Sequence, residues 1–200
     1  MFEEFRSVRR SGLGDGRLRL SANLAGGPAL APRDFAKRRP RTTLGASVVA
    51  AAPTGQYAPA KLINLGGNRW AVKPEVGVSH PAGRWVFEAY AGAWLFADNP
   101  DFYGGSVREQ QPLGTFQAHV SYTFRPRLWL AADATYYTGG RTTVGGVMNA
   151  DFQKNSRVGL TLAVPVGRRQ SVKLSWAKGA TTRIGGDFQT LAVAWQYLWF

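Results

Sequence analysis

The chain has 200 residues, of which 44% are hydrophobic and 12% aromatic, a composition that allows a buried core and argues against intrinsic disorder. It contains no cysteine, which excludes disulfides, thiolate metal sites and a thiol nucleophile. Its 25 Lys and Arg residues outnumber 12 Asp and Glu residues, but the basic clusters lie in turn-like segments. No basic helix or aromatic RNA-binding motif is present, so we expect no nucleic-acid partner.

The N-terminal segment, residues 1–15, is polar and charged. MFEEFRSVRR carries acids where a signal peptide is basic, and no apolar region follows it, so the sequence shows no export signal. No window reaches the roughly 18 to 20 apolar residues that a membrane-spanning helix needs. We expect a single β-barrel domain over residues 1–200, with residues 1–15 as a polar lead and the strands in 16–200.

From Arg17 onward, apolar and polar residues alternate with the period of two that is typical of strands. Nine segments show this alternation: 17–24, 42–52, 70–80, 84–97, 115–124, 128–138, 156–166, 171–177 and 189–200. Most are longer than soluble strands and close to the roughly 9 to 11 residues of a transmembrane β-strand. Pro74 lacks a backbone donor, so we expect the third strand to be bulged or locally unpaired there.

The connections alternate between tight turns and long polar loops. The tight turns are 80–83, 125–127 and 167–170, and the long loops are 53–68, 98–112, 139–155 and 178–187. Short turns on one rim and long loops on the other are typical of outer-membrane barrels. The connection 26–41 is longer than this scheme predicts for the turn side, and its ALAPRDFAKRR stretch predicts a short amphipathic helix.

The polar faces of the strands define a candidate pore lining. The residues opposite the aliphatic face are Arg17, Arg19, Lys73, Glu75, Glu88, Gln117, His119, Asp133, Arg157 and Lys173. A membrane barrel turns this face into its lumen, whereas a soluble β-sandwich would turn it to water. The predicted membrane-interface aromatics near strand ends are Trp70, Trp85, Phe124, Tyr136, Trp195, Tyr197 and Trp199. The alternative for these rings is a sandwich core.

Strand counting points to a missing piece at the N-terminus. Bacterial single-chain barrels have even numbers of strands, and nine strands cannot close in the usual antiparallel way. Residues 1–15 are too polar to supply the ascending strand. Together with the missing signal, this predicts an N-terminal truncation or a misplaced start codon. An upstream reading frame with neither a signal peptide nor alternating strands would contradict it.

Two sets of residues suggest chemistry other than transport. His119 and Ser121 share a strand face, as a hydrolase pair would, but residues two apart on a strand are neighbours by default. Asp98, Asn99 and Asp101 resemble a sparse calcium loop, although their spacing matches no strong template and turn-forming residues are the simpler interpretation. We therefore predict no catalytic residue, metal or cofactor.

Several segments together resemble a bacterial family named for a MetA pathway of phenol degradation. They are SGLGDGRLRLSANLAGGPAL, PTGQYAPAKLINLGGNRWAVKPEVGVS, FADNPDFYGGSVREQQPLG, VSYTFRPRLWLAADATYYTGGRTTVGG, NSRVGLTLAVPVGRRQSVKLSWAKG and the WQY ending. The resemblance runs from about Ser11 to the end with order and spacing kept. It implies an outer-membrane β-barrel described as a transporter, with a link to aromatic compounds.

The C-terminal strand, QTLAVAWQYLWF, resembles the ending of other outer-membrane barrels. That resemblance implies an assembly signal at Trp195, Tyr197, Trp199 and Phe200, which the barrel-assembly machinery recognises. Two registers are open for this strand. Phe200 outward would put Gln196 into lipid, so we predict the register with Leu191, Val193, Trp195, Tyr197 and Trp199 outward.

These observations predict an all-β, antiparallel up-and-down transmembrane β-barrel, with nine strands visible and the N-terminus incomplete. We expect it to lie in the bacterial outer membrane, in contact with lipid and lipopolysaccharide, and to pass or gate small solutes, aromatic compounds among them. The alternatives are a non-conducting structural or partner-binding barrel and a soluble β-sandwich binding module.

Overall fold

The computed structural model describes residues 9–27, 30–31, 34, 37–185 and 187–199. Over this part of the chain no helix is long and apolar enough to cross a bilayer. Residues 29, 32–33 and 35–36 of the predicted helix in ALAPRDFAKRR lie outside the described residues, as do residues 1–8 of the polar N-terminal segment and Phe200 of the predicted assembly signal.

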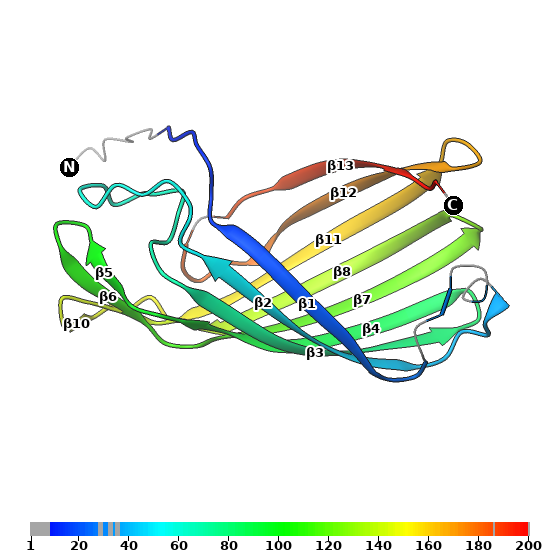
Figure 1. Cartoon of the computed structure of the whole chain (residues 1–200), viewed down its shortest axis with the longest axis horizontal. Helices are drawn as coiled ribbons and strands as arrows, with labels where there is room; N and C mark the ends of the chain where they lie inside the picture. Colours follow the sequence, from blue (N-terminus) through cyan, green and yellow to red (C-terminus); the bar gives the residue numbers. More distant parts are fainter. Residues whose placement is uncertain (1–8, 28–29, 32–33, 35–36, 186, 200) are drawn as a thin grey trace.

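One nine-stranded antiparallel sheet forms the body of the molecule (Figure 1). Its strands, in spatial order, are β1 (Gly16–Ala25), β2 (Thr43–Ala52), β3 (Ala71–Ala82), β4 (Trp85–Phe96), β7 (Leu113–Arg125), β8 (Leu128–Gly139), β11 (Gln153–Pro165), β12 (Gln170–Thr181) and β13 (Thr190–Tyr197). All nine predicted strands are present, and apart from the inserted loop strands each pairs with the next along the chain. The alternation of the sequence therefore located the strands correctly.

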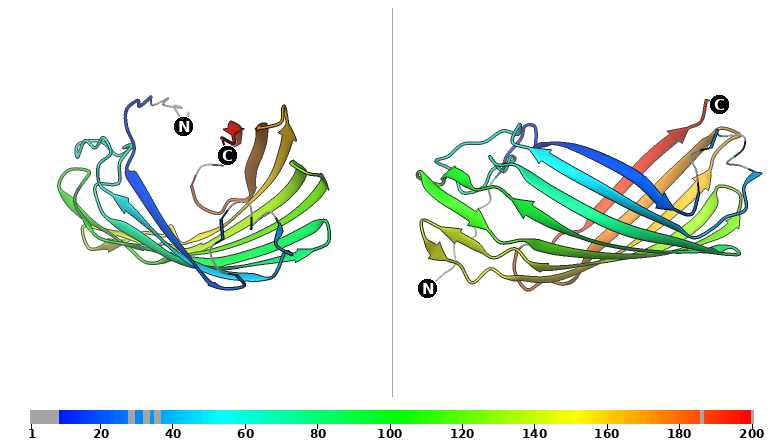
Figure 2. Two further views of the ribbon diagram at one scale, coloured as in Figure 1. Left: turned by 45° about the vertical axis from the view of Figure 1, so that its right-hand side comes forward. Right: turned by 60° about the horizontal axis from the view of Figure 1, so that its bottom comes forward.

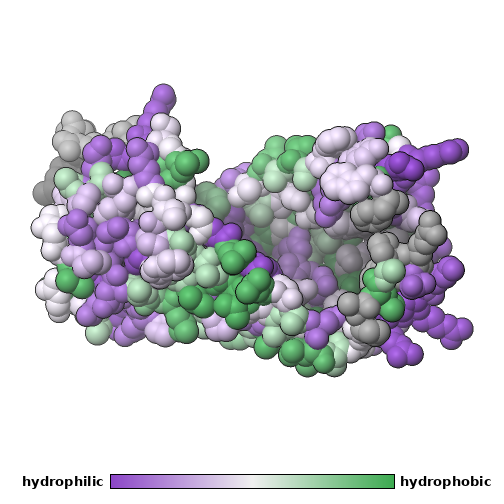
Figure 3. All heavy atoms as spheres, in the orientation of Figure 1, coloured by the Kyte–Doolittle hydropathy of each residue, from purple (hydrophilic) through white to green (hydrophobic). Residues whose placement is uncertain are grey.

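The sheet curves into a trough rather than lying flat (Figure 2). Among the described residues, β1 and β13 each pair on one side only, so they form the two edges of the sheet. Hydrophilic atoms gather at the two ends of the molecule, and hydrophobic atoms spread across the middle (Figure 3). The soluble β-sandwich does not fit, because the only other sheet within the described residues is a small one built from loops, and large apolar side chains such as Leu191 (77% exposed) remain uncovered.

The two rims differ as predicted. Tight turns follow β3, β7 and β11, and Arg127 in the second of them has φ +67°. The long loops lie at the opposite rim, at the left of Figure 1. We call these ends the turn rim and the loop rim. At Pro74 the β3–β4 ladder has a gap between the pairs Val72–Leu95 and Glu75–Gly92, which confirms the local unpairing that its missing donor predicts.

The loops 98–112 and 139–155 contain four short strands in addition to the nine that the sequence predicts. They contain β5 (Asn99–Phe102), β6 (Ser106–Gln110), β9 (Thr142–Val144) and β10 (Val147–Met148), which form a second, four-stranded sheet. Its central pairing joins β6 of one loop to β9 of the other. Strands of two to five residues show too little alternation to be read from sequence, and this pairing is between distant segments.

Candidate functional site

The register of the sheet places all predicted lining residues on its concave face. Side chains of paired residues in adjacent strands point the same way, and alternate residues along a strand share a face. Glu88 pairs with His119, and His119 pairs with Asp133. The same pairing and alternation put the whole set on that face: Arg17, Arg19, Lys73, Glu75, Glu88, Gln117, His119, Asp133, Arg157 and Lys173.

Glu75 is the centre of one polar cluster on this face. Its carboxylate accepts hydrogen bonds from Arg19 Nη2 (2.9 Å), Lys73 Nζ (2.6 Å) and Gln117 Nε2 (3.0 Å), and Ser47 Oγ lies 3.4 Å away. The side chain is only 3% exposed. A carboxylate this well covered is tolerated because two cations and an amide satisfy its oxygens.

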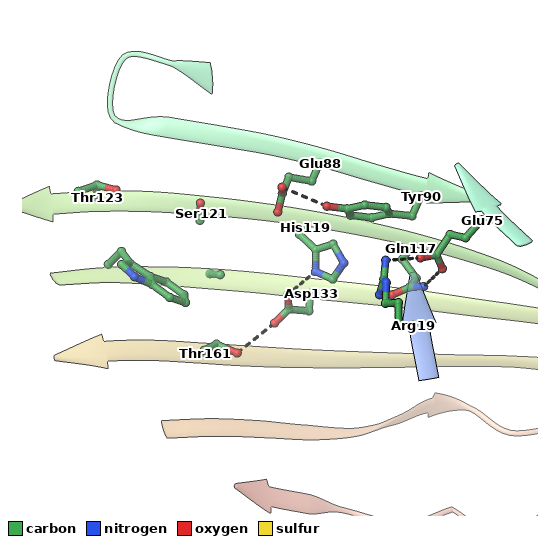
Figure 4. A pocket seen from close by; sticks show the side chains of 12 residues that line it. Arg19, Glu75, Glu88, Tyr90, Gln117, His119, Ser121, Thr123, Asp133 and Thr161 are labelled. Carbon is green, nitrogen blue, oxygen red and sulfur yellow. Dashed lines mark hydrogen bonds and ion pairs between the residues drawn. The ribbon is translucent and has the colours of Figure 1, made fainter. Parts of the chain in front are cut away.

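His119 and Asp133 form a second cluster next to the first (Figure 4). His119 Nδ1 lies 2.5 Å from Asp133 Oδ1, and Thr161 Oγ1 donates to Asp133 Oδ2 at 3.4 Å. Tyr90 meets the imidazole edge-on, with ring centroids 5.6 Å apart, and its hydroxyl donates to Glu88. Within the described residues, no hydrogen bond joins His119 to Ser121, so the structure does not assemble the hydrolase pair.

The two clusters line a cavity of about 570 Å³ on the concave face. Acidic and amide side chains form much of its wall, while Trp129 lies at one side with Thr123 and Ser121. A second hollow of about 530 Å³ shares Arg19, Glu75, Glu88 and Tyr90 with it and extends along β1 and β2. The two hollows therefore form one continuous polar groove on the concave face.

Three aromatic rings also lie on the concave face, although only polar side chains were predicted to line it. Tyr90, Trp94 and Trp129 share the face of Glu88 and Asp133 by simple alternation, a signal that was present in the sequence. Cations lie against two of these rings. Trp94 has Lys73 Nζ 5.8 Å and Arg17 Cζ 5.9 Å from its centroid, and Trp129 has Lys173 Nζ at 5.4 Å.

The predicted interface aromatics lie on the convex face or at the strand ends. At the turn rim, Trp85 packs on Tyr122 (4.8 Å between centroids), which packs on Phe124 (5.0 Å). Trp195, Tyr197 and Trp199 form a second row with spacings of 6.1 Å. At the loop rim, Tyr136 is 41% and Trp70 is 55% exposed.

The register of β13 agrees with the predicted one. Gln196 pairs with Ser171 and Ala194 pairs with Lys173, so Gln196 lies on the concave face. Leu191, Val193, Trp195 and Tyr197 consequently point to the convex side.

At the loop rim, two residues of the suspected calcium loop, Asn99 and Asp101, form hydrogen bonds within and between loops. Asn99 is buried, and its amide donates to Tyr57 Oη and accepts from Asn68 Nδ2, both at 2.9 Å. Asp101 offers its backbone N–H to the same side chain. In the described part of the chain, no group of three His, Cys, Asp or Glu residues is arranged to hold a metal ion. Asn99 thus ties two loops together.

Arg69 lies beside this network and has an unusual charge environment. Burial lowers the pKa of its guanidinium to about 10, with repulsion from Arg108 acting in the same direction and Asp98 acting against both. Its guanidinium stacks 4.6 Å from the Phe96 ring centroid and donates to Gln110. Nη1 is buried and has no hydrogen-bond partner among the described residues.

A curved antiparallel sheet with tight turns on one rim, an apolar convex face and a charged concave face has the architecture of a transmembrane β-barrel of the outer-membrane type, and among the described residues β1 and β13 do not pair to close it. A family model described as "Putative MetA-pathway of phenol degradation" matches residues 2–196, and the chain belongs to that family. No curated protein was found to match the chain.

A solved structure with the same fold is the crystal structure of an outer membrane channel from Pseudomonas putida F1. It is 23% identical to this chain, with a TM-score of 0.78. The match covers 94% of this chain and 67% of the other, so the chain spans about two thirds of that protein.

Proposed function

We propose that the protein is an outer-membrane channel that passes small solutes and favours anions. The observation that carries the proposal is the charge of the concave face, where the predicted lining residues include five cations and three carboxylates. The Pseudomonas structure is described as an outer membrane channel, and the family description names phenol degradation, which favours aromatic compounds among the solutes.

The surplus of positive charge among the predicted lining residues is unevenly distributed over the concave face. Glu75 pairs with Arg19 and Lys73, whereas Arg17, Arg157 and Lys173 have no carboxylate within ion-pair distance among the described residues. Unpaired cations in a narrow, partly apolar passage attract anions and repel other cations. This distribution supports anion preference along the pathway.

Charge reversal tests the proposal. The double variant Lys73→Glu and Lys173→Glu should shift the reversal potential in a potassium chloride gradient from anion toward cation selectivity in planar bilayers. Lys178→Glu is the matched control, because Lys178 pairs with Val158 on the convex face. Unchanged selectivity in the double variant would remove the anion preference from the proposal.

We propose transport in preference to catalysis. The His119–Asp133 pair has the base and orienting carboxylate of a hydrolase, but no serine donates to the imidazole within the described residues. A hydrolysis assay with nitrophenyl esters tests this choice. Turnover that His119→Gln abolishes would favour an enzyme.

A second candidate function is a non-conducting barrel that binds partners through its loops. The observation that favours it is the hydrogen-bonded loop sheet, in which three loops form one ordered wall at the loop rim. Ordered loops offer a fixed binding surface. Absence of single-channel conductance from inserted protein would favour this candidate over the channel.

We propose that the protein lies in the outer membrane and that its partners are lipid and the barrel-assembly machinery. The convex apolar face suits lipid, and the Trp195, Tyr197 and Trp199 row suits recognition by the barrel-assembly machinery. Replacing these three rings with alanine should slow insertion into membranes that contain the machinery. Equal insertion rates would argue against the assembly signal.

A further inference from the structure

We infer that Trp129 and Lys173 form a binding site for planar aromatic carboxylates at the turn-rim end of the concave groove. The inference rests on the proposed solute channel and names a solute class for it. It draws on three features of the site: the position of the ammonium near the ring, the open space beside the ring, and the absence of a carboxylate within ion-pair distance of Lys173 among the described residues.

Three neighbouring strands bring the pair together. Ala163 of β11 pairs with Trp129 of β8 on one side and with Lys173 of β12 on the other, so the lysine reaches across a small residue to the ring. Lys173 Nζ lies 5.4 Å from the Trp129 ring centroid. On its other side Lys173 pairs with Ala194 of β13. On the two neighbouring strands, the residues paired with Lys173 are therefore both alanines, and its ammonium lies near the Trp129 ring.

The ring borders open space on two sides. Trp129 lines the 570 Å³ cavity described above and also a separate cavity of about 390 Å³ at the turn rim. Ala163, Ser171 and Gln196 line the second cavity with it. A single aromatic ring is far smaller than either space. Trp129 is therefore a platform that a solute can reach from either cavity.

The charge of Lys173 is available to a solute. Among the described residues no carboxylate lies within ion-pair distance of it, whereas Lys73 on β3 is 2.6 Å from Glu75. Lys73, the lysine that lies near Trp94, already has its charge neutralised by Glu75. Lys173 is the lining lysine that can pair with an incoming anion.

These features select for a ring and an anionic group in one molecule. An aromatic carboxylate can stack against the indole while its oxygens accept from the Lys173 ammonium. A neutral phenol lacks the charge, and an aliphatic acid lacks the flat ring. Ser171 and Gln196 at the border of the site supply further hydrogen-bonding groups for ring substituents.

Current block in planar bilayers tests the inference, with benzoate and cyclohexanecarboxylate as probes of equal charge and similar size. Benzoate should half-block the chloride current at a roughly two- to tenfold lower concentration, the range expected for one aromatic pair. Trp129→Leu should remove this difference. Trp176→Leu, at a tryptophan that pairs with Leu160 on the convex face, should keep it. Lys173→Gln should weaken block by both anions, and Lys178→Gln should weaken neither.

Equal block by the two probes in an anion-selective channel would overturn the inference and leave the proposed function standing. If the inserted protein conducts no current, calorimetric titration of the detergent-solubilised chain with the same probes decides the inference by itself. Tighter binding of benzoate that depends on Trp129 would support the site although the channel had failed. No difference between the probes there would overturn it.

Discussion

Glu75 shows how one side chain organises the groove at the residue scale. It is the one acidic residue of β3, and it accepts hydrogen bonds from Arg19 of β1, Lys73 of its own strand and Gln117 of β7. Glu88 lies on the same face but accepts only the Tyr90 hydroxyl among the described residues, at 3.2 Å. Loss of the Glu75 carboxylate would therefore leave at least three hydrogen-bond donors without their acceptor, whereas loss of the Glu88 carboxylate would leave one.

Glu75→Gln should lower the free energy of unfolding by about 2 kcal/mol, because it leaves two cations without their shared carboxylate. The half-exposed Arg19 recovers part of its hydration, which keeps the loss modest. Urea unfolding of the protein in lipid vesicles measures the change. Glu88→Gln is the matched control and should cost about 1 kcal/mol or less. Equal losses for the two variants would contradict the central role of Glu75.

At the scale of elements, the loop sheet depends on polar contacts more than on a core. Thr142 at the start of β9 is buried, donates its N–H to Asp151 Oδ1 (2.9 Å) and its hydroxyl to Oδ2 (2.6 Å). Asn149 donates to the same hydroxyl. One carboxylate thus holds the β9–β10 turn closed and keeps β9 in place against β6.

The ionisation of Asp151 makes this element sensitive to acid. Burial raises the pKa of its carboxyl, but the hydrogen bonds from Thr142, with help from Arg108, outweigh burial and leave the pKa below its ordinary value of about 3.9. A lowered carboxyl pKa stabilises the fold above the unfolded value, and that stability is lost as pH falls through the folded pKa. Amide protection in residues 142–149 should therefore drop below about pH 4.

Hydrogen–deuterium exchange, corrected for intrinsic rates, follows this drop. Asp151→Asn should lower protection at neutral pH and remove the acid step. Asp101→Asn, in the neighbouring loop, should leave the step in place. An acid step that persists in Asp151→Asn would mean that another group titrates there.

At the scale of the whole molecule, the two faces of one sheet meet different solvents. Trp94 and Trp129 lie on the concave face, whereas Trp176 and Trp195 lie on the convex face. Trp70, Trp85 and Trp199 are more than two fifths exposed at the strand ends. The seven tryptophans therefore report on the orientation of the sheet in a membrane.

Single-tryptophan variants in vesicles should divide into two groups. Bromine-labelled acyl chains should quench Trp176 and Trp195 strongly and Trp129 weakly, and aqueous iodide should show the reverse order. The physical reason is that a quencher must touch the indole. Strong quenching of Trp129 by lipid bromine would contradict the assignment of the concave face as the lumen.

The sequence by itself determined the nine long strands and the face that each residue occupies, because side chains alternate strictly along a strand. Arg17 and Lys173 could be assigned to one face from alternation alone, and so could Trp94 and Trp129, which were overlooked because only polar residues were counted. The gap at Pro74 could be predicted because proline lacks a backbone donor. The register of β13 could be predicted because the alternative register would place Gln196 in lipid.

Only the tertiary structure decided which side chains meet. The pairing of β6 with β9, the cluster at Glu75 and the contact between His119 and Asp133 join residues from different strands or loops. The curvature of the sheet and the reach of each side chain set these contacts. Alternation specifies a direction, whereas a contact requires a distance, and distances between strands arise only when the sheet is assembled.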